Sequence, residues 1–439
     1  MNDSADTERE VPVIIPRPEH NISRANISKN ALKVLYRLKD AGYESFIVGG
    51  GVRDLLLGRE PKDFDIATDA HPEEVRRLFR NCRLIGRRFR LAHIHFGRDI
   101  IEVATFRAAP IDHDGDDHDH ATSEEGRILR DNIYGGIDDD VWRRDFTANG
   151  LYYNVADFSI WDYVGGVEDV RNGVMRLIGD PPARYREDPV RMLRAVRFAA
   201  KLGFRIEAST EAPLFELGEL LRDVPAARLF DECLKLFLSG HALPSFELLR
   251  HYDMFRHLFP AADSELEGLE GETFRALVLN SLENTDRRVA EGKTVTPTFL
   301  FAVFLWGSVS RLAGKLRESG DAPMQAMLEA ADTVLRNQQS HVSIPRRFGV
   351  PLKDIMALQV RFRNQHGRRA LRVLEHPSFR AAYDFMRLRS LAGEDSVENV
   401  EFWTQLQEMD PEHRRSKVQP ARGRRRRRRR PPRRKKPNA

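Results

Sequence analysis

Two aspartates, Asp63 and Asp65, stand one residue apart in the segment DFDIAT of residues 63–68. The apolar Phe64 and Ile66 alternate with them, which predicts a short strand with one apolar and one acidic face. Two carboxylates on one face repel each other unless cations lie between them, and a pair of Mg²⁺ ions is a common solution in nucleotidyl transfer. The segment therefore predicts a two-magnesium site, with a solvated polar strand as the alternative.

A glycine-rich turn precedes this acidic strand. The segment VGGGVRDLLLG of residues 48–58 has the pattern of a strand end, a turn and a helix. Gly50 and Gly51 would let backbone N–H groups approach a triphosphate, and Arg53 would add a positive charge. A tight turn without any ligand explains such glycines equally well, so the turn by itself does not decide the function.

Composition indicates a chain with more than one core. It has 439 residues, 41% of them hydrophobic, and only two cysteines, Cys82 and Cys233. That length allows several domains, and two cysteines supply neither a disulfide framework nor a cysteine-rich zinc site. The opening residues are acidic, and no apolar run reaches about 18 residues. We therefore expect a cytoplasmic protein with no membrane partner.

Positive charge is concentrated at the C-terminal end. Of the 71 Lys and Arg residues, 15 lie in residues 413–439, which contain no Asp or Glu. The rest of the chain then has 56 basic and 66 acidic residues, which is a net charge of −10, although the net charge of the whole chain is +5. A basic tail of this kind indicates binding to a polyanion, and RNA and DNA fit equally well.

Hydrophobic periodicity predicts an α+β protein: a small mixed-sheet head, then an all-helical neck, body and leg, then a disordered basic tail. We expect the following segments: a flexible arm at 1–25, the head at 26–180, the neck at 181–260, the body at 261–412 and the tail at 413–439.

An acidic, histidine-bearing insert at about 108–126 interrupts the head and should be mobile. Its histidines are His113, His118 and His120, with His93 or His95 more distant in the sequence. They could bind a metal, but a solvated acidic loop explains the same composition.

One predicted helix combines acidic and basic side chains. In EDPVRMLRAVRF, which starts at Glu187, the residues Asp188, Arg191 and Arg194 recur every three positions along one face, with a proline near the first turn. A carboxylate beside a guanidinium can present an acceptor and donors to the edge of a base. A salt-bridged helix surface is the alternative.

These motifs occur in a fixed order along the chain. The turn with Gly50 and Gly51, the pair Asp63 and Asp65, and the later Ile101-Glu102-Val103 resemble the DNA polymerase β-like nucleotidyltransferase superfamily. Three later stretches narrow this resemblance to a single family. They are RRDFTANGLYY (143–153), DYVGGVEDVRNGVMRLIG (162–179) and REDPVRMLRAVRFAAKLGF (186–204). They are similar to the successive motifs of the class II tRNA nucleotidyltransferase and poly(A) polymerase family, over residues 45–260.

The resemblance implies roles for individual residues. Asp63 and Asp65 would bind two Mg²⁺ ions and, with Asp145, form the catalytic set, and Glu102 is a rival third metal ligand. The residues implied to bind ATP are Gly50, Gly51, Arg53, Arg143, Asn149, Asp188, Arg191 and Arg194. The helix that bears Asp188 would select the incoming base in place of a nucleic-acid template.

The head motifs are common to two activities. Two further segments and the basic tail favour one of them. The stretch LRVLEHPSFRAAYDFMRLR (371–389) and RNCRLIGRRFRLAHIHFG (80–97) resemble segments of the poly(A) polymerases. An arginine-rich tail also suits an enzyme that binds many unrelated RNAs, because contacts to phosphate do not depend on the base sequence. We expect polyadenylation of RNA 3′ ends from ATP, with RNA-decay proteins as possible partners in mRNA processing. The alternatives are a CCA-adding enzyme and a non-catalytic RNA-binding protein.

Overall fold

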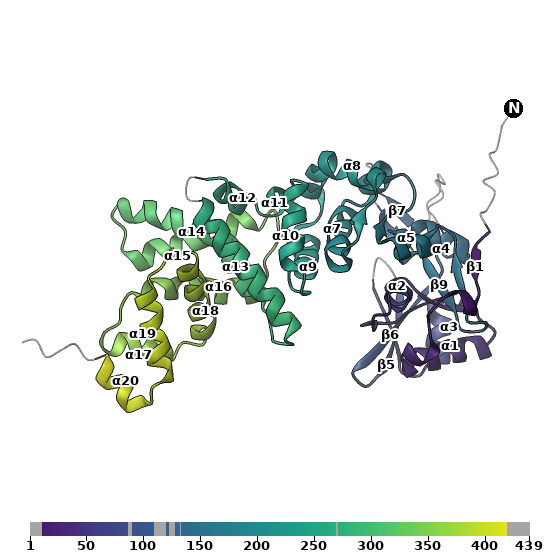
Figure 1. Ribbon diagram of the computed structural model, residues 1–439, viewed down its shortest axis with the longest axis horizontal. Helices are drawn as coiled ribbons and strands as arrows, with labels where there is room; N and C mark the ends of the chain where they lie inside the picture. Colours follow the sequence, from purple (N-terminus) through teal and green to yellow (C-terminus); the bar gives the residue numbers. More distant parts are fainter. Residues whose placement is uncertain are drawn as a thin grey trace, which may run out of the picture. The chain divides into compact units, whose positions relative to one another are not determined.

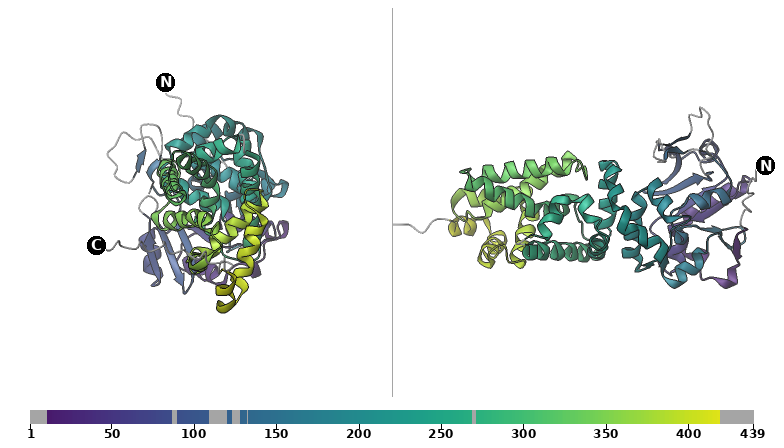
Figure 2. Two further views of the ribbon diagram at one scale, coloured as in Figure 1. Left: turned by 90° about the vertical axis from the view of Figure 1, so that its left-hand side faces the viewer. Right: turned by 90° about the horizontal axis from the view of Figure 1, so that it is seen from above.

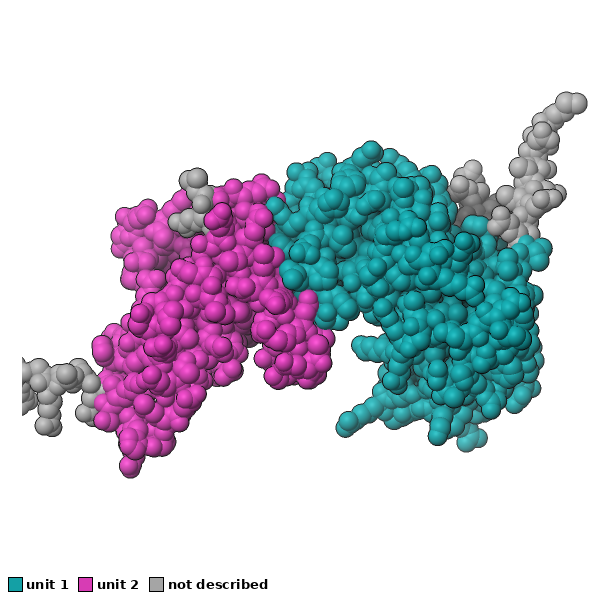
Figure 3. All heavy atoms as spheres, viewed as in Figure 1, with its two compact units in different colours: residues 1–258 teal, residues 259–439 magenta. Residues whose placement is uncertain are grey.

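The computed structural model describes residues 11–86, 90–108, 120–122, 128–131, 133–268 and 271–418. The chain forms two compact units that divide after Leu258, shown in different colours in Figure 3. All strands among the described residues lie in unit 1, and unit 2 is helical (Figures 1 and 2). The predicted α+β class is confirmed.

A mixed sheet forms the centre of unit 1. Its order among the described residues is β1-β10-β9-β2-β3-β6-β5-β4, and only the β3–β6 pair is parallel. The strands are β1 (Val13–Ile15), β2 (Ser45–Val48), β3 (Asp65–Thr68), β4 (Cys82–Ile85), β5 (Leu91–Phe96), β6 (Asp99–Thr105), β9 (Leu151–Asn154) and β10 (Ile160–Asp162). Two further pairs are β7 (His120–Thr122) with β8 (Ile128–Asp131), and β11 (Val174–Met175) with β12 (Arg205–Ile206).

Helices pack on this sheet and continue beyond it in unit 1. They are α1 (Lys29–Asp40), α2 (Gly50–Leu56), α3 (Pro72–Leu78), α4 (Ile137–Arg143), α5 (Gly166–Asn172), α6 (Pro181–Glu187), α7 (Val190–Leu202), α8 (Ala208–Leu217), α9 (Ala226–Phe237), α10 (Ala242–His251) and α11 (Phe255–Leu258). Helix α1 begins after Ser28, because the Ser28 hydroxyl accepts hydrogen bonds from the backbone N–H groups of Asn30 and Ala31. Val141 of α4 packs with Phe46, Ala67 and Tyr152 on one face of the sheet.

The N-terminal arm is more ordered than predicted. Residues 13–15 form β1, which pairs antiparallel with β10. This edge strand has three residues, and two of them, Val13 and Ile14, are more than half exposed. Such a short, exposed strand has no hydrophobic periodicity, which is why the sequence did not predict it.

Unit 2 consists of α12 (Pro260–Leu266), α13 (Gly271–Ala290), α14 (Pro297–Glu318), α15 (Pro323–Gln338), α16 (Arg346–Phe362), α17 (Gly367–Leu374), α18 (Phe379–Leu391), α19 (Val397–Glu408) and α20 (Pro411–Lys417). Helix α14 is long and apolar enough to cross a membrane by length and composition alone. Its side chains from Leu300 to Trp306 are buried in unit 2, as in the core helix of a globular domain.

The segment predicted to be a disordered tail begins with a helix. Helix α20 extends to Lys417, because the Asp410 carboxylate accepts hydrogen bonds from the N–H groups of Glu412 and His413, and the Arg414 guanidinium donates to the carbonyls of Leu406 and Gln407. Residues 419–439 lie outside the described residues, as does most of the predicted insert, with His113 and His118.

Candidate active site

The carboxylates of the acidic strand lie on the face that the sequence predicted. Phe64 and Ile66 are buried, whereas Asp63 and Asp65 are exposed. The strand is shorter than predicted, since β3 begins at Asp65 and Asp63 lies just before it. On the neighbouring parallel strand β6, Glu102 is the register partner of Asp65, so these two carboxylates lie side by side, and Asp63 is two residues before Asp65 in the chain.

Burial and the neighbouring carboxylates both disfavour the ionised form of Asp65. Partial burial, Glu102 and Asp63 raise its pKa to about 6, against the opposing effect of the Arg144 guanidinium. The Asp65 side chain still contacts solvent, so these groups act at an accessible surface. Glu102 also contacts His93 of β5, whose Nε2 lies 3.2 Å from Glu102 Oε2.

This arrangement suits a hard divalent cation. All three groups are oxygen ligands, which Mg²⁺ prefers, and a cation would favour the ionised form of Asp65 that burial and the neighbouring carboxylates disfavour. Within the described part of the chain, no three acidic, histidine or cysteine side chains form a group that could hold a metal ion by themselves. A metal at these carboxylates would need further oxygen donors, such as the phosphates of a substrate. The His93 and His95 rings lie 6.4 Å apart, and the side chain of His120 is not described.

The three glycines of the turn differ from one another in backbone conformation and in burial. Gly49, not Gly50 or Gly51, has the positive φ of 67° and precedes α2. Gly51 is buried, and a Cβ there would lie 3.4 Å from Ile47 Cγ2 and 3.6 Å from the Asp63 carbonyl oxygen. A Cβ at Gly51 would thus make ordinary van der Waals contacts with β2 and with the segment that precedes β3, while Gly50 is the more accessible glycine.

Arg53 is directed into the protein. Its side chain is 3% exposed and forms an ion pair with Asp54 at 2.7 Å. It also donates a hydrogen bond of 2.6 Å to the Asn149 side-chain oxygen. Arg53 and Asn149, both predicted to bind ATP, therefore contact each other.

Asp145 lies in a buried network and not among the other carboxylates. Its side chain accepts hydrogen bonds from Asn149 Nδ2 at 3.0 Å and from Arg194 Nε of α7 at 2.7 Å. Burial would raise its pKa, but Arg194 and these hydrogen bonds lower the pKa to about 2. Together with Arg53, the network connects α2, the 3₁₀ turn Thr147–Asn149 and α7.

A pocket of about 340 Å³ lies beside this network. It is lined by Arg143, Arg144, Asp145, Asp188, Val190, Arg191, Arg194, Arg228 and Glu232. The structure thus brings together five of the predicted site residues: Arg143, Asp145, Asp188, Arg191 and Arg194. Asp188 precedes α7, whose first residue is Val190, so it borders the predicted helical face without belonging to the helix.

Cations dominate the pocket wall. Burial, followed by the positive charge of Arg107, lowers the pKa of Arg143 to about 9. Arg191 donates to Glu187 at 2.7 Å and to the carbonyl of Arg184 at 2.8 Å, which fixes its guanidinium. The lining contains five guanidinium groups and three carboxylates, and this excess of positive charge suits a polyanionic ligand such as a triphosphate.

Sequence reasoning missed four lining residues: the apolar Val190 and the charged Arg144, Arg228 and Glu232. Arg144 is adjacent to the predicted Arg143, and its Nε donates to the Tyr152 hydroxyl at 2.7 Å. Arg228 donates to Asp188 at 2.7 Å from α9, and Glu232 lies one helical turn farther along the same helix. The spacing of Arg228 and Glu232 places them on one face of α9, but only the fold shows that this face meets α7.

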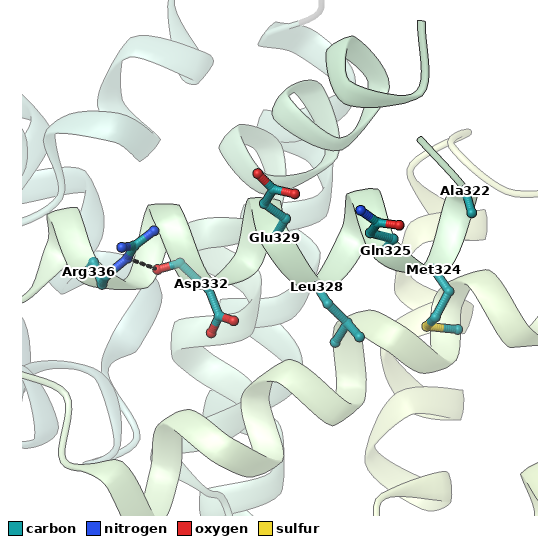
Figure 4. Close-up of a pocket in the computed structure, with 7 residues that line it drawn as sticks. All are labelled: Ala322, Met324, Gln325, Leu328, Glu329, Asp332 and Arg336. Atoms are coloured by element: carbon teal, nitrogen blue, oxygen red, sulfur yellow. Dashed lines mark hydrogen bonds between the residues drawn. The ribbon is translucent and has the colours of Figure 1, made fainter. Parts of the chain in front are cut away.

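Unit 2 has a shallow surface pocket of about 870 Å³ along α15. Figure 4 shows side chains from this one helix region, including Met324, Leu328 and Arg336, whose Nε donates to the Asp332 carbonyl. None of the predicted site residues lies there.

Comparison with known proteins identifies the family. Poly(A) polymerase I of Salmonella typhimurium is 49% identical over 409 residues, which cover 91% of this chain and 86% of that protein. The chain belongs to the bacterial poly(A) polymerase family. Residues 45–176 match the family described as "Poly A polymerase head domain", 203–266 match "Probable RNA and SrmB- binding site of polymerase A", and 319–436 match "Polymerase A arginine-rich C-terminus".

Relatives outside the poly(A) polymerases are more distant. A CCA-adding enzyme of Lactobacillus helveticus is 38% identical over 218 residues, which cover 50% of this chain and 52% of that protein. A solved structure titled "tRNA-processing enzyme (apo form I)" shares the fold, with a TM-score of 0.57 and 22% identity, covering 88% of this chain and 93% of that one. As a member of the poly(A) polymerase family, the chain is a nucleotidyltransferase, which confirms the predicted enzyme class.

Proposed function

We propose that this enzyme transfers AMP from ATP to the 3′-hydroxyl of RNA and releases pyrophosphate, repeating the reaction to build a poly(A) tail. The observation that supports this most is the position of Arg144. It lines the arginine-rich pocket with Asp145, and it donates to the hydroxyl of Tyr152, whose register partner Val48 is in turn the register partner of Asp65. A triphosphate bound by these arginines would therefore lie next to the three carboxylates.

The residues of the pocket divide into two groups by chemistry. Arg143, Arg144 and Arg194 supply positive charge for the triphosphate. Asp188 and Arg191 offer an acceptor and donors to the edge of the adenine base, and their partners Arg228 and Glu187 hold them in place. Arg53 acts indirectly in this scheme, since it holds Asn149, which in turn contacts Asp145.

Asp63, Asp65 and Glu102 are the residues that would hold two Mg²⁺ ions. Bound Mg²⁺ would lower the pKa of the attacking hydroxyl and stabilise the charge on the departing pyrophosphate. The bond that forms joins the RNA 3′-oxygen to the α-phosphorus, and the bond that breaks joins this phosphorus to the pyrophosphate oxygen. No covalent intermediate with the enzyme is needed.

The raised pKa of Asp65 predicts a pH effect on metal binding. Below pH 6 the carboxyl is mostly protonated, so Mg²⁺ must displace a proton, and affinity should fall as the pH decreases through about 6. Calorimetric titration of the enzyme with Mg²⁺ in buffers of different ionisation enthalpy should show proton release near pH 6. Raising the Mg²⁺ concentration should also shift the acid limb of the activity profile to lower pH. A Mg²⁺ affinity that is constant from pH 5 to pH 7 would contradict the assignment of Asp65 as a ligand.

Substrate choice separates this proposal from the two alternatives. The enzyme should be given a generic RNA oligonucleotide or a tRNA that lacks its 3′-terminal CCA, each with ATP or CTP and Mg²⁺. Long A-tracts on the generic RNA with little use of CTP would support polyadenylation. Addition of C, C and A to the tRNA followed by arrest would indicate a CCA-adding enzyme. No incorporation on either RNA would indicate a non-catalytic RNA-binding protein.

The C-terminal tail is proposed to hold RNA by phosphate contacts. Removing residues 419–439 should weaken RNA binding and flatten its dependence on salt, because fewer counterions are released when fewer cations meet phosphates. The KM for ATP should not change, since the pocket lies in unit 1. Filter binding at several salt concentrations tests this prediction, and an unchanged salt slope would count against it.

The cellular setting follows from this activity as part of the same proposal. We propose a cytoplasmic enzyme that acts in mRNA processing and decay, with RNA 3′ ends and ATP as substrates and RNA-decay proteins as possible partners. Isolation of RNA tails from cells with and without the enzyme tests this role.

A further inference from the structure

We infer that the outer face of strands β4, β5 and β6, beside Asp65, binds the last nucleotides of the acceptor RNA. This inference rests on the proposed AMP transfer to RNA. The surface, which we call the acceptor face, comprises Arg83, Ile85, Leu91, His93, His95 and Ile100.

Strand register places these residues on the same face as the carboxylates. Arg83 of β4 is the partner of His93 on β5, His93 is the partner of Glu102 on β6, and Glu102 is the partner of Asp65 on β3. Side chains of register partners in adjacent strands lie side by side on one face. Three interstrand spacings separate Arg83 from Asp65, a distance of about 14 Å. Along this row of register partners, the side chains change from basic at Arg83 to acidic at Asp65.

The two faces of these strands differ in burial. Ala92, Ile94 and Val103 are buried on the face that α1 and α3 cover. On the acceptor face, Ile85 is 40% exposed and Ile100 is 43% exposed. In the described part of the chain, neither Arg83 nor His95 forms an ion pair with a carboxylate. Exposed apolar side chains beside a guanidinium and an imidazole that lack such partners indicate a surface for a ligand that is both apolar and anionic.

Single-stranded RNA has this combination of properties. Its phosphates would contact Arg83 and His95, and its bases would pack on Ile85, Ile100 and the imidazole rings. His93 has another contact, because its Nε2 lies 3.2 Å from Glu102. It would position Glu102 at the boundary between RNA and the carboxylates.

The arginine-rich pocket, which is proposed to bind ATP, lies on the opposite side of Asp65 from the acceptor face. Along the same row, Asp65 pairs with Val48, and Val48 pairs with Tyr152, whose hydroxyl contacts the pocket residue Arg144. In an in-line displacement, the attacking oxygen and the leaving pyrophosphate stand on opposite sides of the phosphorus. With ATP on the Tyr152 side of Asp65, the 3′-hydroxyl would approach from the acceptor face.

Kinetic separation of the two substrates tests the inference. Arg83→Glu and, as a milder second variant, His95→Ala should raise the KM for a short RNA by about fivefold to tenfold, the effect of losing one or two contacts to charged phosphate. The KM for ATP should stay within about twofold of wild type, because both side chains lie away from the pocket. Arg76→Glu, an exposed arginine of α3 on the covered side of these strands, is the matched control and should change neither constant. If both variants had the same KM for RNA as the Arg76→Glu control, the inference would be overturned.

Photocrosslinking supplies a second, positional test that uses the wild-type enzyme. An RNA with 4-thiouridine next to its 3′ end should crosslink to peptides that contain residues 82–86 or 91–100. Crosslinks confined to other parts of the chain, while RNA is extended normally, would overturn the acceptor face and leave the proposed reaction intact. Failure of the wild-type enzyme to extend RNA would instead remove the proposed function on which the inference rests. If a partner protein occupied this face, the variants would lose that partner and keep the RNA KM, which also contradicts the inference.

Discussion

Replacing Asp63 with Ala is expected to lower the rate of AMP transfer by roughly a hundredfold or more, the scale seen when one group that stabilises the transition state is removed. Asp63 is exposed, so the thermal unfolding midpoint should change little. Primer extension with saturating ATP and RNA measures the rate. Asp40→Ala, which removes the same charge at the exposed end of α1, should keep wild-type activity. Wild-type-like transfer by the Asp63 variant would rule out the carboxylate site.

Asp65→Asn should show opposite effects on activity and stability. The raised pKa of Asp65 means that its ionised form is disfavoured in the folded protein. A neutral amide removes the repulsion from Glu102 and Asp63, so the unfolding midpoint should rise slightly while transfer is lost. A lower midpoint would show that Asp65 is primarily a structural residue.

Breaking the Asp145–Arg194 pair is expected to produce the second large effect, on both stability and ATP affinity. The Asp145 and Arg194 side chains are 12% and 31% exposed, so removing one leaves its partner poorly solvated. Asp145→Ala should reduce the free energy of unfolding by about 2–3 kcal/mol, and weaken ATP binding because Arg194 loses its orientation.

A double-mutant cycle with Arg194→Met isolates this interaction. The coupling energy between the two residues should be about 1–3 kcal/mol, as for other residues in one buried network. The contribution of this pair to the free energy of unfolding should be lost in acid. The pKa of Asp145 in the folded protein, about 2, lies below the usual value of 3.8, so the stabilisation is present above pH 4 and is lost as the pH falls towards 2. Additive effects of the two substitutions would contradict a direct pair.

Local patterns in the sequence predicted much of unit 1. Alternation of Phe64 and Ile66 with the two aspartates was enough to predict that both aspartates are exposed while Phe64 and Ile66 are buried. The edge strands β1 and β4 were not predicted, because strands of three or four residues with exposed side chains leave no periodic signal.

Contacts between distant segments could not be read from the sequence. The sequence predicted Arg53 as a phosphate ligand, but its burial against Asn149 depends on packing between residues 96 positions apart. Asp188 and Arg228 are 40 positions apart, and their ion pair likewise requires the fold to bring α9 beside the start of α7. Motif spacing therefore identified most of the pocket residues, while the partners that orient them came from tertiary structure.

The most direct test of the central claim is the fate of labelled ATP in the presence of RNA. The enzyme is incubated with a generic RNA, Mg²⁺ and ATP labelled at either the α- or the γ-phosphate. Our account predicts that α-label enters the RNA 3′ end as AMP and that γ-label appears as pyrophosphate in equal amount, with both signals absent in Asp63→Ala. Release of γ-label as free phosphate, or RNA that stays unlabelled by α-labelled ATP, would contradict it.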